Sequence, residues 1–247
     1  MPSVQQIKSR LKSVSATKQI TGALQLVSAS KMRRAMVDVR RTLPYVTATR
    51  RLLADLARDA SILETNGLFK RRILTRRLLI VISSDSGLAG AYNSKITHEL
   101  SEQLQTDVAR HVTTAVVTVG RKISEFANKL RGVTVLASFV PSPEADDAAI
   151  NSLLKLVVDE FRSEHYDAID VIYTKFHSSL NQTAIAEHLL PIGRTGDDAT
   201  VDQQLDAKFE PSRAAVLTAV LERLLRAEIV QALLDSRASE HSMRMMA

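Results

Sequence analysis

One segment of this sequence has residue types and spacing that could support enzyme chemistry, the turn SDSGLAGAYN at residues 84–93. It follows the apolar run RLLIVISS (77–84), and a glycine-rich turn between a strand and a helix can bind phosphate through its backbone N–H groups. The turn lacks the GK[ST] ending of a P-loop, the GxGxxG pattern and the GxSxG nucleophile elbow. Two interpretations therefore stay open: a simple strand-to-helix turn, or a phosphometabolite-binding enzyme of α/β fold that uses this turn.

The remaining reactive side chains form no recognisable catalytic set. Ser83, Ser84 and Ser86 have no His or Asp partner at a familiar spacing, and Asp85 is expected to cap or brace its turn. The six histidines form no HExxH motif and no pair at i, i+4 spacing, and the chain has no cysteine. We therefore expect no catalytic residue, no metal and no cofactor.

Positive charge is concentrated at the N-terminus. Residues 1–41 hold nine Lys and Arg residues against Asp38 alone, although the whole chain has a net charge of only +6. A nucleic-acid binder would need base-reading or stacking groups beside these charges, and a membrane-surface helix would carry Trp or Phe on its apolar face. A solvated face would mix in acids at i±4. Because none of these patterns is present, we expect a protein partner with an acidic surface, and no nucleic acid.

The basic residues lie on a long predicted helix, over residues 3–59. Its apolar positions Val4, Ile7, Leu11 and Val14 step by three and four, and Pro44 is expected to kink or briefly break it. At about 1.5 Å per residue the segment 3–43 spans roughly 60 Å, against roughly 40 Å for a compact domain of this size. The helix should therefore project from any globular part. No apolar run is long enough to span a membrane, and the N-terminus lacks a signal core.

The middle of the chain alternates strands with helices, which predicts an α/β fold with a mostly parallel, five-stranded, Rossmann-like sheet covered by helices on both faces. We place this central domain at 73–192. Its strands are expected at 77–84, 113–119, 133–140, 168–176 and 183–190, with helices at 94–110, 121–130 and from the Pro-rich loop at 141–143 to about 165.

A second long helix is predicted at the C-terminal end, within a segment 209–247 in which Pro211 suits a first helical position. Its paired apolar positions complement the N-terminal stripe. The two terminal helices should therefore pack as one antiparallel coiled coil, made of residues 1–59 and 209–247.

Five segments in the same order resemble the gamma subunits of F-type ATP synthases. They are ATKQITGALQLVSASKMRRA, TLPYVTATRRLLADLA, ISSDSGLAGAYNSKI, VIYTKFHSSLNQTAIAEHLLPI and FEPSRAAVLTAVLERLLRAEIVQALLDSRASEHSMRMMA. The resemblance spans residues 3–247. It implies a non-catalytic rotor, the central stalk, whose helical shaft turns inside a hexamer of alpha and beta subunits and couples ion flow through the membrane c-ring to ATP synthesis or hydrolysis.

The same resemblance implies which subunits the chain contacts and where in the cell it is located. One such subunit per complex would meet the alpha and beta subunits, the epsilon subunit and the c-ring. It would lie at the cytoplasmic face of the cell membrane, or the equivalent face of an organelle membrane, and touch the membrane only through the Fo sector.

Partner-contact residues are also implied by the resemblance, in three groups. The segment VSASKMRR (27–34) would meet acidic loops of the beta subunits beside the C-terminal RM motif; a second group would lie near the c-ring; a third would lie higher on the shaft. The first group is Ser28, Ser30, Lys31, Met32, Arg33 and Arg34, together with Arg244. The second is Phe209 and Glu210, and the third is Arg10, Lys12 and Lys18.

One departure from the family concerns the C-terminal helix, which in the family continues for several turns past the ASE…RM motif. Here the sequence ends at Ala247, so the chain is either shortened or carries a single helix at the top of its shaft. The segment SEHSMRMMA would then lie beside VSASKMRR. The apolar residues Val4, Ile7, Leu11, Val14 and Ile20 are accordingly expected to extend beyond their partner helix.

Overall fold

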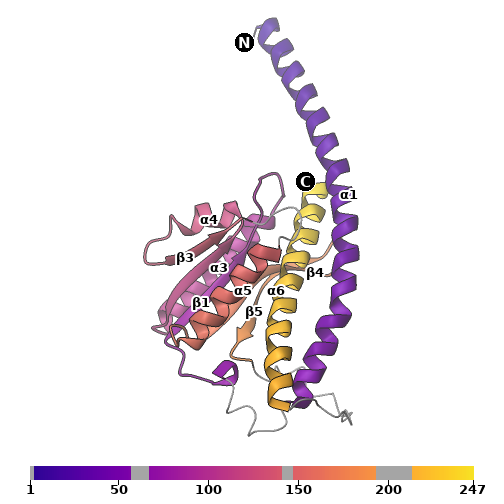
Figure 1. Cartoon of the computed structure of the whole chain (residues 1–247). Helices are drawn as coiled ribbons and strands as arrows, with labels where there is room; N and C mark the ends of the chain where they lie inside the picture. Colours follow the sequence, from indigo (N-terminus) through magenta and orange to yellow (C-terminus); the bar gives the residue numbers. More distant parts are fainter. Residues whose placement is uncertain (1–2, 57–66, 141–146, 193–212) are drawn as a thin grey trace.

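Two long terminal helices lie beside a five-stranded sheet in the computed structural model, which describes residues 3–56, 67–140, 147–192 and 213–247 (Figure 1). Helix α1 runs from Val4 to Leu56 and helix α6 from Arg213 to Met246. A single turn of 3-10 helix, η1 (Gly67–Phe69), precedes the sheet. Among the described helices, none is both long and apolar enough to cross a membrane.

The sheet confirms the predicted α/β architecture. Strands β1, β2, β3 and β4 are parallel, and β5 is antiparallel to β4, in the order β3-β2-β1-β4-β5. The central strand β1 is buried from its third residue onward, as its unbroken apolar sequence predicts. The bounds are β1 Arg76–Ile82, β2 Thr113–Val119, β3 Thr134–Phe139, β4 Ala168–Phe176 and β5 Gln182–Leu190.

Helices cover both faces of the sheet. Helices α3 (Tyr92–Ala109) and α4 (Arg121–Ala127) pack on one face, where Leu79 and Val81 meet Ile96. Helices α5 (Asp147–Arg162) and α6 cover the other face, which holds the larger core cluster. Helix α6 therefore belongs to the core of the sheet domain as well as to the pair of terminal helices.

The terminal helices pack antiparallel, as predicted. Ala35 and Val39 of α1 lie in one cluster with Leu234 and Ala238 of α6. Continued in the same register, this pairing brings residues 239–247 beside about residues 26–34, the segment expected from the sequence.

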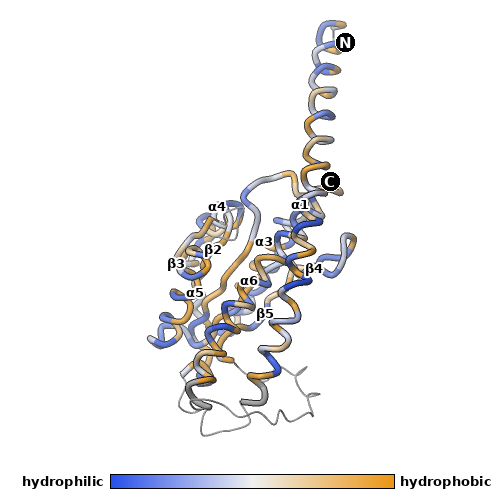
Figure 2. Tube along the Cα trace, turned by 45° about the vertical axis from the view of Figure 1, so that its right-hand side comes forward, coloured by the Kyte–Doolittle hydropathy of each residue, from blue (hydrophilic) through white to orange (hydrophobic). Residues whose placement is uncertain are grey.

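The N-terminal part of α1 extends past the end of α6, which both views of the chain show (Figure 2). Its apolar residues Val4, Ile7, Leu11, Val14 and Ile20 are 71%, 51%, 70%, 68% and 60% exposed. The expectation that this stripe has no partner within the chain is therefore confirmed for the described residues.

The break considered at Pro44 does not occur, because α1 continues through it; the alternative, a kink, stays a prediction. Pro44 lacks the N–H that would bond the Arg40 carbonyl. Both residues are on the exposed side of α1, so water can satisfy that carbonyl. In Figure 1 the helix bows around α6 instead of breaking. The end of the predicted helix, residues 57–59, lies outside the described residues.

Candidate functional site: a basic helical shaft and its joints to the sheet

The exposed face of α1 carries most of the predicted partner-contact residues. Ser30, Lys31, Arg33 and Arg34 are exposed, and Met32 is half-buried. Arg10, Lys12 and Lys18 are exposed on the part that extends past α6. Within the described residues, none of the nine Lys and Arg side chains of residues 1–41 forms an ion pair with an acidic group. Apart from Asp38, α1 up to residue 41 therefore exposes cations without compensating acids.

Ser28 and Arg244 are engaged inside the chain. Ser28 is 2% exposed at the contact between the terminal helices. The Arg244 side chain is 10% exposed and forms an ion pair of 2.7 Å with Glu240. Its guanidinium also donates to the Ser86 hydroxyl at 2.9 Å. Partner contact by these two residues stays a prediction. Phe209 and Glu210 lie outside the described residues.

The glycine-rich turn is occupied by the end of α6. Ala89 and Tyr92 form a buried cluster with Met243, and Arg244 donates to the Ser86 hydroxyl. Gly90 has a φ of +53°, and a Cβ there would lie 3.5 Å from Cβ of Ala247. The turn thus holds α6 against the sheet domain, which leaves the phosphate-binding alternative without support.

The first turn of α4 is capped by side chains from the neighbouring turn. Its N-cap residue is Gly120, which has no side chain to offer. The Asp85 carboxylate accepts from the Arg121 N–H at 3.0 Å, and the Ser83 hydroxyl accepts from the Ile123 N–H at 2.9 Å. Asp85 therefore braces its turn, as expected from the sequence, and satisfies a helix N–H that would otherwise lack a partner.

His241 is a partly buried histidine near the end of α6, close to Arg244 and to Lys31 of α1. Burial, together with the nearby cations Arg244 and Lys31, lowers the pKa of His241 to about 4. His241 is consequently neutral near pH 7. Among the described residues, no group of three or more His, Asp or Glu side chains is arranged to hold a metal ion.

A second set of polar contacts, which we call the polar joint, consists of Arg50, Tyr173, Glu187 and Glu228. Arg50 of α1 donates through Nε to Glu228 of α6 at 2.8 Å and through Nη2 to Glu187 of β5 at 3.1 Å. The Tyr173 hydroxyl of β4 donates to the other Glu187 oxygen at 2.6 Å. The joint therefore connects α1 to α6 and to the sheet.

Asp235 lies beside this joint and is only 5% exposed. Burial is the main cause that raises its pKa from 3.8 to about 6, with a smaller contribution from the charge of Glu187. Hydrogen bonding from Gln231 and the charge of Lys175 oppose the shift. Gln231 also accepts a 2.5 Å hydrogen bond from Thr42 of α1.

We predict that Asp235→Asn stabilises the protein at neutral pH. Because the folded-state pKa lies above the unfolded value, wild-type stability falls as pH rises from about 4 to 6, and the full cost of ionising this buried carboxyl is present above that range. Asn has no charge to bury. The variant should gain about 3 kcal/mol of unfolding free energy at pH 7.5 and only about 0.5 kcal/mol at pH 4. Urea unfolding at both pH values tests this, with the exposed Asp159→Asn as control; an equal gain at both values would contradict it.

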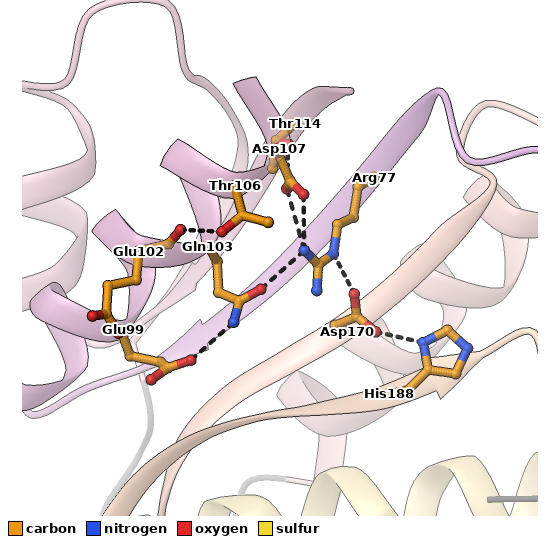
Figure 3. A network of polar contacts seen from close by, with 9 residues as sticks. All are labelled: Arg77, Glu99, Glu102, Gln103, Thr106, Asp107, Thr114, Asp170 and His188. Carbon is orange, nitrogen blue, oxygen red and sulfur yellow. Dashed lines mark hydrogen bonds and ion pairs between the residues drawn. The ribbon is translucent and has the colours of Figure 1, made fainter. Parts of the chain in front are cut away.

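Figure 3 shows a buried network of charged residues that was not predicted from the sequence. Arg77 of β1 donates to Asp170 of β4 and, at 3.0 Å, to Asp107 of α3. His188 of β5 contacts the other Asp170 oxygen at 2.5 Å, and this hydrogen bond is the main cause that raises the pKa of His188. The network connects three strands and a helix. Its sequence signal is faint: Arg77 is one of two Arg residues that open β1, and Asp170 is the one acidic residue of β4.

Taken together, these contacts define a class of protein. The described residues bring together no recognisable catalytic set. The polar groups instead fasten a long helical shaft to an α/β base. The molecule is built as a mechanical subunit with a basic shaft surface.

Comparison with known proteins assigns the family. A family profile described as ATP synthase matches residues 3–247. The ATP synthase gamma chain of Fusobacterium nucleatum is 35% identical over 246 residues, which cover 99% of this chain and 84% of the relative. That of Anaeromyxobacter sp. strain K is 35% identical over 253 residues, covering 100% of this chain and 86% of the relative. The chain belongs to the ATP synthase gamma-chain family. It is a central-stalk rotor subunit and not itself an enzyme.

Solved structures share the fold. The central stalk and c-ring structure of the Tetrahymena thermophila mitochondrial ATP synthase contains a chain with a TM-score of 0.70 and 20% identity, covering 92% of this chain and 96% of that one. A rotor chain of the Euglena gracilis enzyme has a TM-score of 0.58 and 14% identity, covering 97% of this chain and 87% of that one.

Proposed function

We propose that the basic face of α1 is the bearing surface of this rotor, and that it turns against acidic loops of a hexamer of alpha and beta subunits. The observation that carries the proposal is the set of exposed cations on α1, which form no ion pair within the described residues: Arg10, Lys12, Lys18, Lys31, Arg33 and Arg34. An acidic partner compensates these charges. Exposed ion pairs are individually weak and screened by salt, so they can exchange as the shaft turns.

The central α/β domain serves as the foot of the rotor. Residues 1–59 and 209–247 form the shaft, and residues 73–192 form the domain that joins the epsilon subunit and the c-ring, with Phe209 and Glu210 near the ring. One copy serves each complex. The subunit is peripheral, at the cytoplasmic face of the cell membrane or its organelle equivalent, and reaches the membrane through the Fo sector. What supports this is membership in the gamma-chain family.

The bearing contact is tested by replacing Arg33 and Arg34 together with Ala in the assembled complex. Each exposed pair is worth about 0.2–1 kcal/mol, so ion pumping per ATP hydrolysed should fall about two- to tenfold. The matched control is the double variant Arg40→Ala and Arg41→Ala, two exposed cations further along the same helix. Measuring ATP hydrolysis and ion uptake on the same vesicles gives the ratio. An unchanged ratio in a normally assembled Arg33/Arg34 variant would remove these residues from the bearing.

A further inference from the structure

We infer that Arg50 is a positioning residue for torque transmission, and that the polar joint is the rigid connection between the α1 shaft and the sheet of the foot. The inference rests on the rotor function proposed above and adds the place in the fold where load passes from one part to the other.

The geometry shows how little of α1 reaches the sheet. Helix α1 packs along α6, and the cluster that holds them together is built from Ala35, Val39, Leu234 and Ala238, with Phe176 of β4 at its side. Leu53 enters the main core near the far end of the helix. Between these apolar contacts, Arg50 supplies a polar link from α1 to a strand, through Glu187.

Arg50 binds two elements at once. The Nε of its guanidinium meets Glu228 on α6 and the Nη2 meets Glu187 on β5. The planar guanidinium fork fixes the direction of both hydrogen bonds, which a flexible ammonium would not do. A turn of α1 about its own axis therefore moves β5 and α6 with it.

The strand side of the joint is itself braced. Tyr173 is 3% exposed and its hydroxyl holds the second oxygen of Glu187 at 2.6 Å. Burial alone would raise the pKa of Glu187, but the hydrogen bonds from Tyr173 and Arg50 outweigh it and lower that pKa. Glu187 is therefore an anion at neutral pH, fixed from β4 and from α1 together.

Directional contacts to the sheet matter here because the apolar contacts on either side of Arg50 are not directional. Apolar burial depends on the area removed from water and hardly on angle, so an apolar contact resists separation of two elements better than their rotation. Hydrogen bonds weaken steeply when they are misaligned. The polar joint is accordingly the element that resists twisting of the shaft against the foot.

The experiment measures torsional stiffness in the assembled complex. The chain has no cysteine, so Val108→Cys, at a position 74% exposed near the end of α3, gives a single attachment point on the foot. With the alpha and beta subunits immobilised and no ATP present, the thermal fluctuation of a probe at this point reports how stiffly the foot follows the shaft. Arg50→Gln removes two of the three hydrogen bonds of the joint, and the angular variance should rise about twofold.

The controls separate a mechanical role from a structural one. Arg51→Gln changes the adjacent, exposed cation and should leave the variance unchanged. Glu187→Gln and Tyr173→Phe should each raise it, and the double variant of Arg50 and Glu187 should add little to Arg50→Gln alone, because both act on one link. Wild-type stiffness in Arg50→Gln and Tyr173→Phe complexes with unchanged melting temperatures would overturn the inference. Failure of the wild-type chain to assemble with alpha and beta subunits would instead overturn the proposed function.

Discussion

Replacing Gly120 with Ala is expected to destabilise the protein by more than about 3 kcal/mol. Gly120 has a φ of +108°, which a residue with a side chain rarely adopts. A Cβ there would lie 2.8 Å from both the carbonyl carbon and the hydroxyl oxygen of Ser83. The neighbour is backbone that is itself fixed, because the Ser83 N–H donates to the Val119 carbonyl at 2.8 Å. Relief of the clash must therefore move β1 or the start of α4.

The matched control for this substitution is Gly132→Ala. Gly132 also has a positive φ, +81°, but a Cβ there meets nothing within 4 Å. It should show backbone strain alone, about 1–2 kcal/mol. Urea unfolding of the two purified variants distinguishes the stability lost to the steric clash from the stability lost to backbone strain alone. Equal losses at the two positions would mean that the approach to Ser83 is not the cause.

Replacing Arg77 with Met should cost about 3–5 kcal/mol of unfolding free energy. The substitution keeps the apolar stem and removes the cation that faces two carboxylates. Asp107 and Asp170 are only 2% and 4% exposed, so neither can recover its hydration without opening the structure. Asp170 would retain His188, while Asp107 would retain the 2.8 Å hydrogen bond from Thr114 and no cation.

The neighbouring Arg76 provides the comparison. Its side chain is 49% exposed and lies 3.8 Å from Asp167. Asp167 also accepts hydrogen bonds from Thr75 and from the Arg76 backbone N–H. Arg76→Met should therefore change stability by less than about 1 kcal/mol. A similar small loss for Arg77→Met would show that the buried carboxylates do not depend on this cation.

Local pattern was enough to predict the elements and their order. Strand β1 reads as buried on both faces because its apolar residues are unbroken, and it is. The terminal helices pair in the register expected from the match of their motifs, with Ala35 and Val39 against Leu234 and Ala238. The burial of β1 follows from its apolar pattern, which a single sequence displays directly, whereas the register of the helices came from the resemblance to the family.

The contacts that were not predicted join residues that are distant in sequence. Arg77 meets Asp170 across 93 positions, and nothing near either residue signals the pairing. The break considered at Pro44 is absent for a different reason: the rule assumes that the lost hydrogen bond is costly, whereas on an exposed side water replaces it. The glycine-rich turn looked free to bind a ligand because its occupant, Met243, comes from the other end of the chain.

The pairing of the first helix with the last has a consequence for how the protein is made. Thr42 and its partner Gln231 are 189 positions apart. At about 5–20 residues per second, the ribosome needs roughly 10–40 s to make the intervening chain. Throughout that interval Ala35 and Val39 of the nascent N-terminal helix lack the α6 residues on which they pack in the folded chain. Biosynthesis therefore exposes α1 to chaperones, or to early capture by another subunit, before α6 exists.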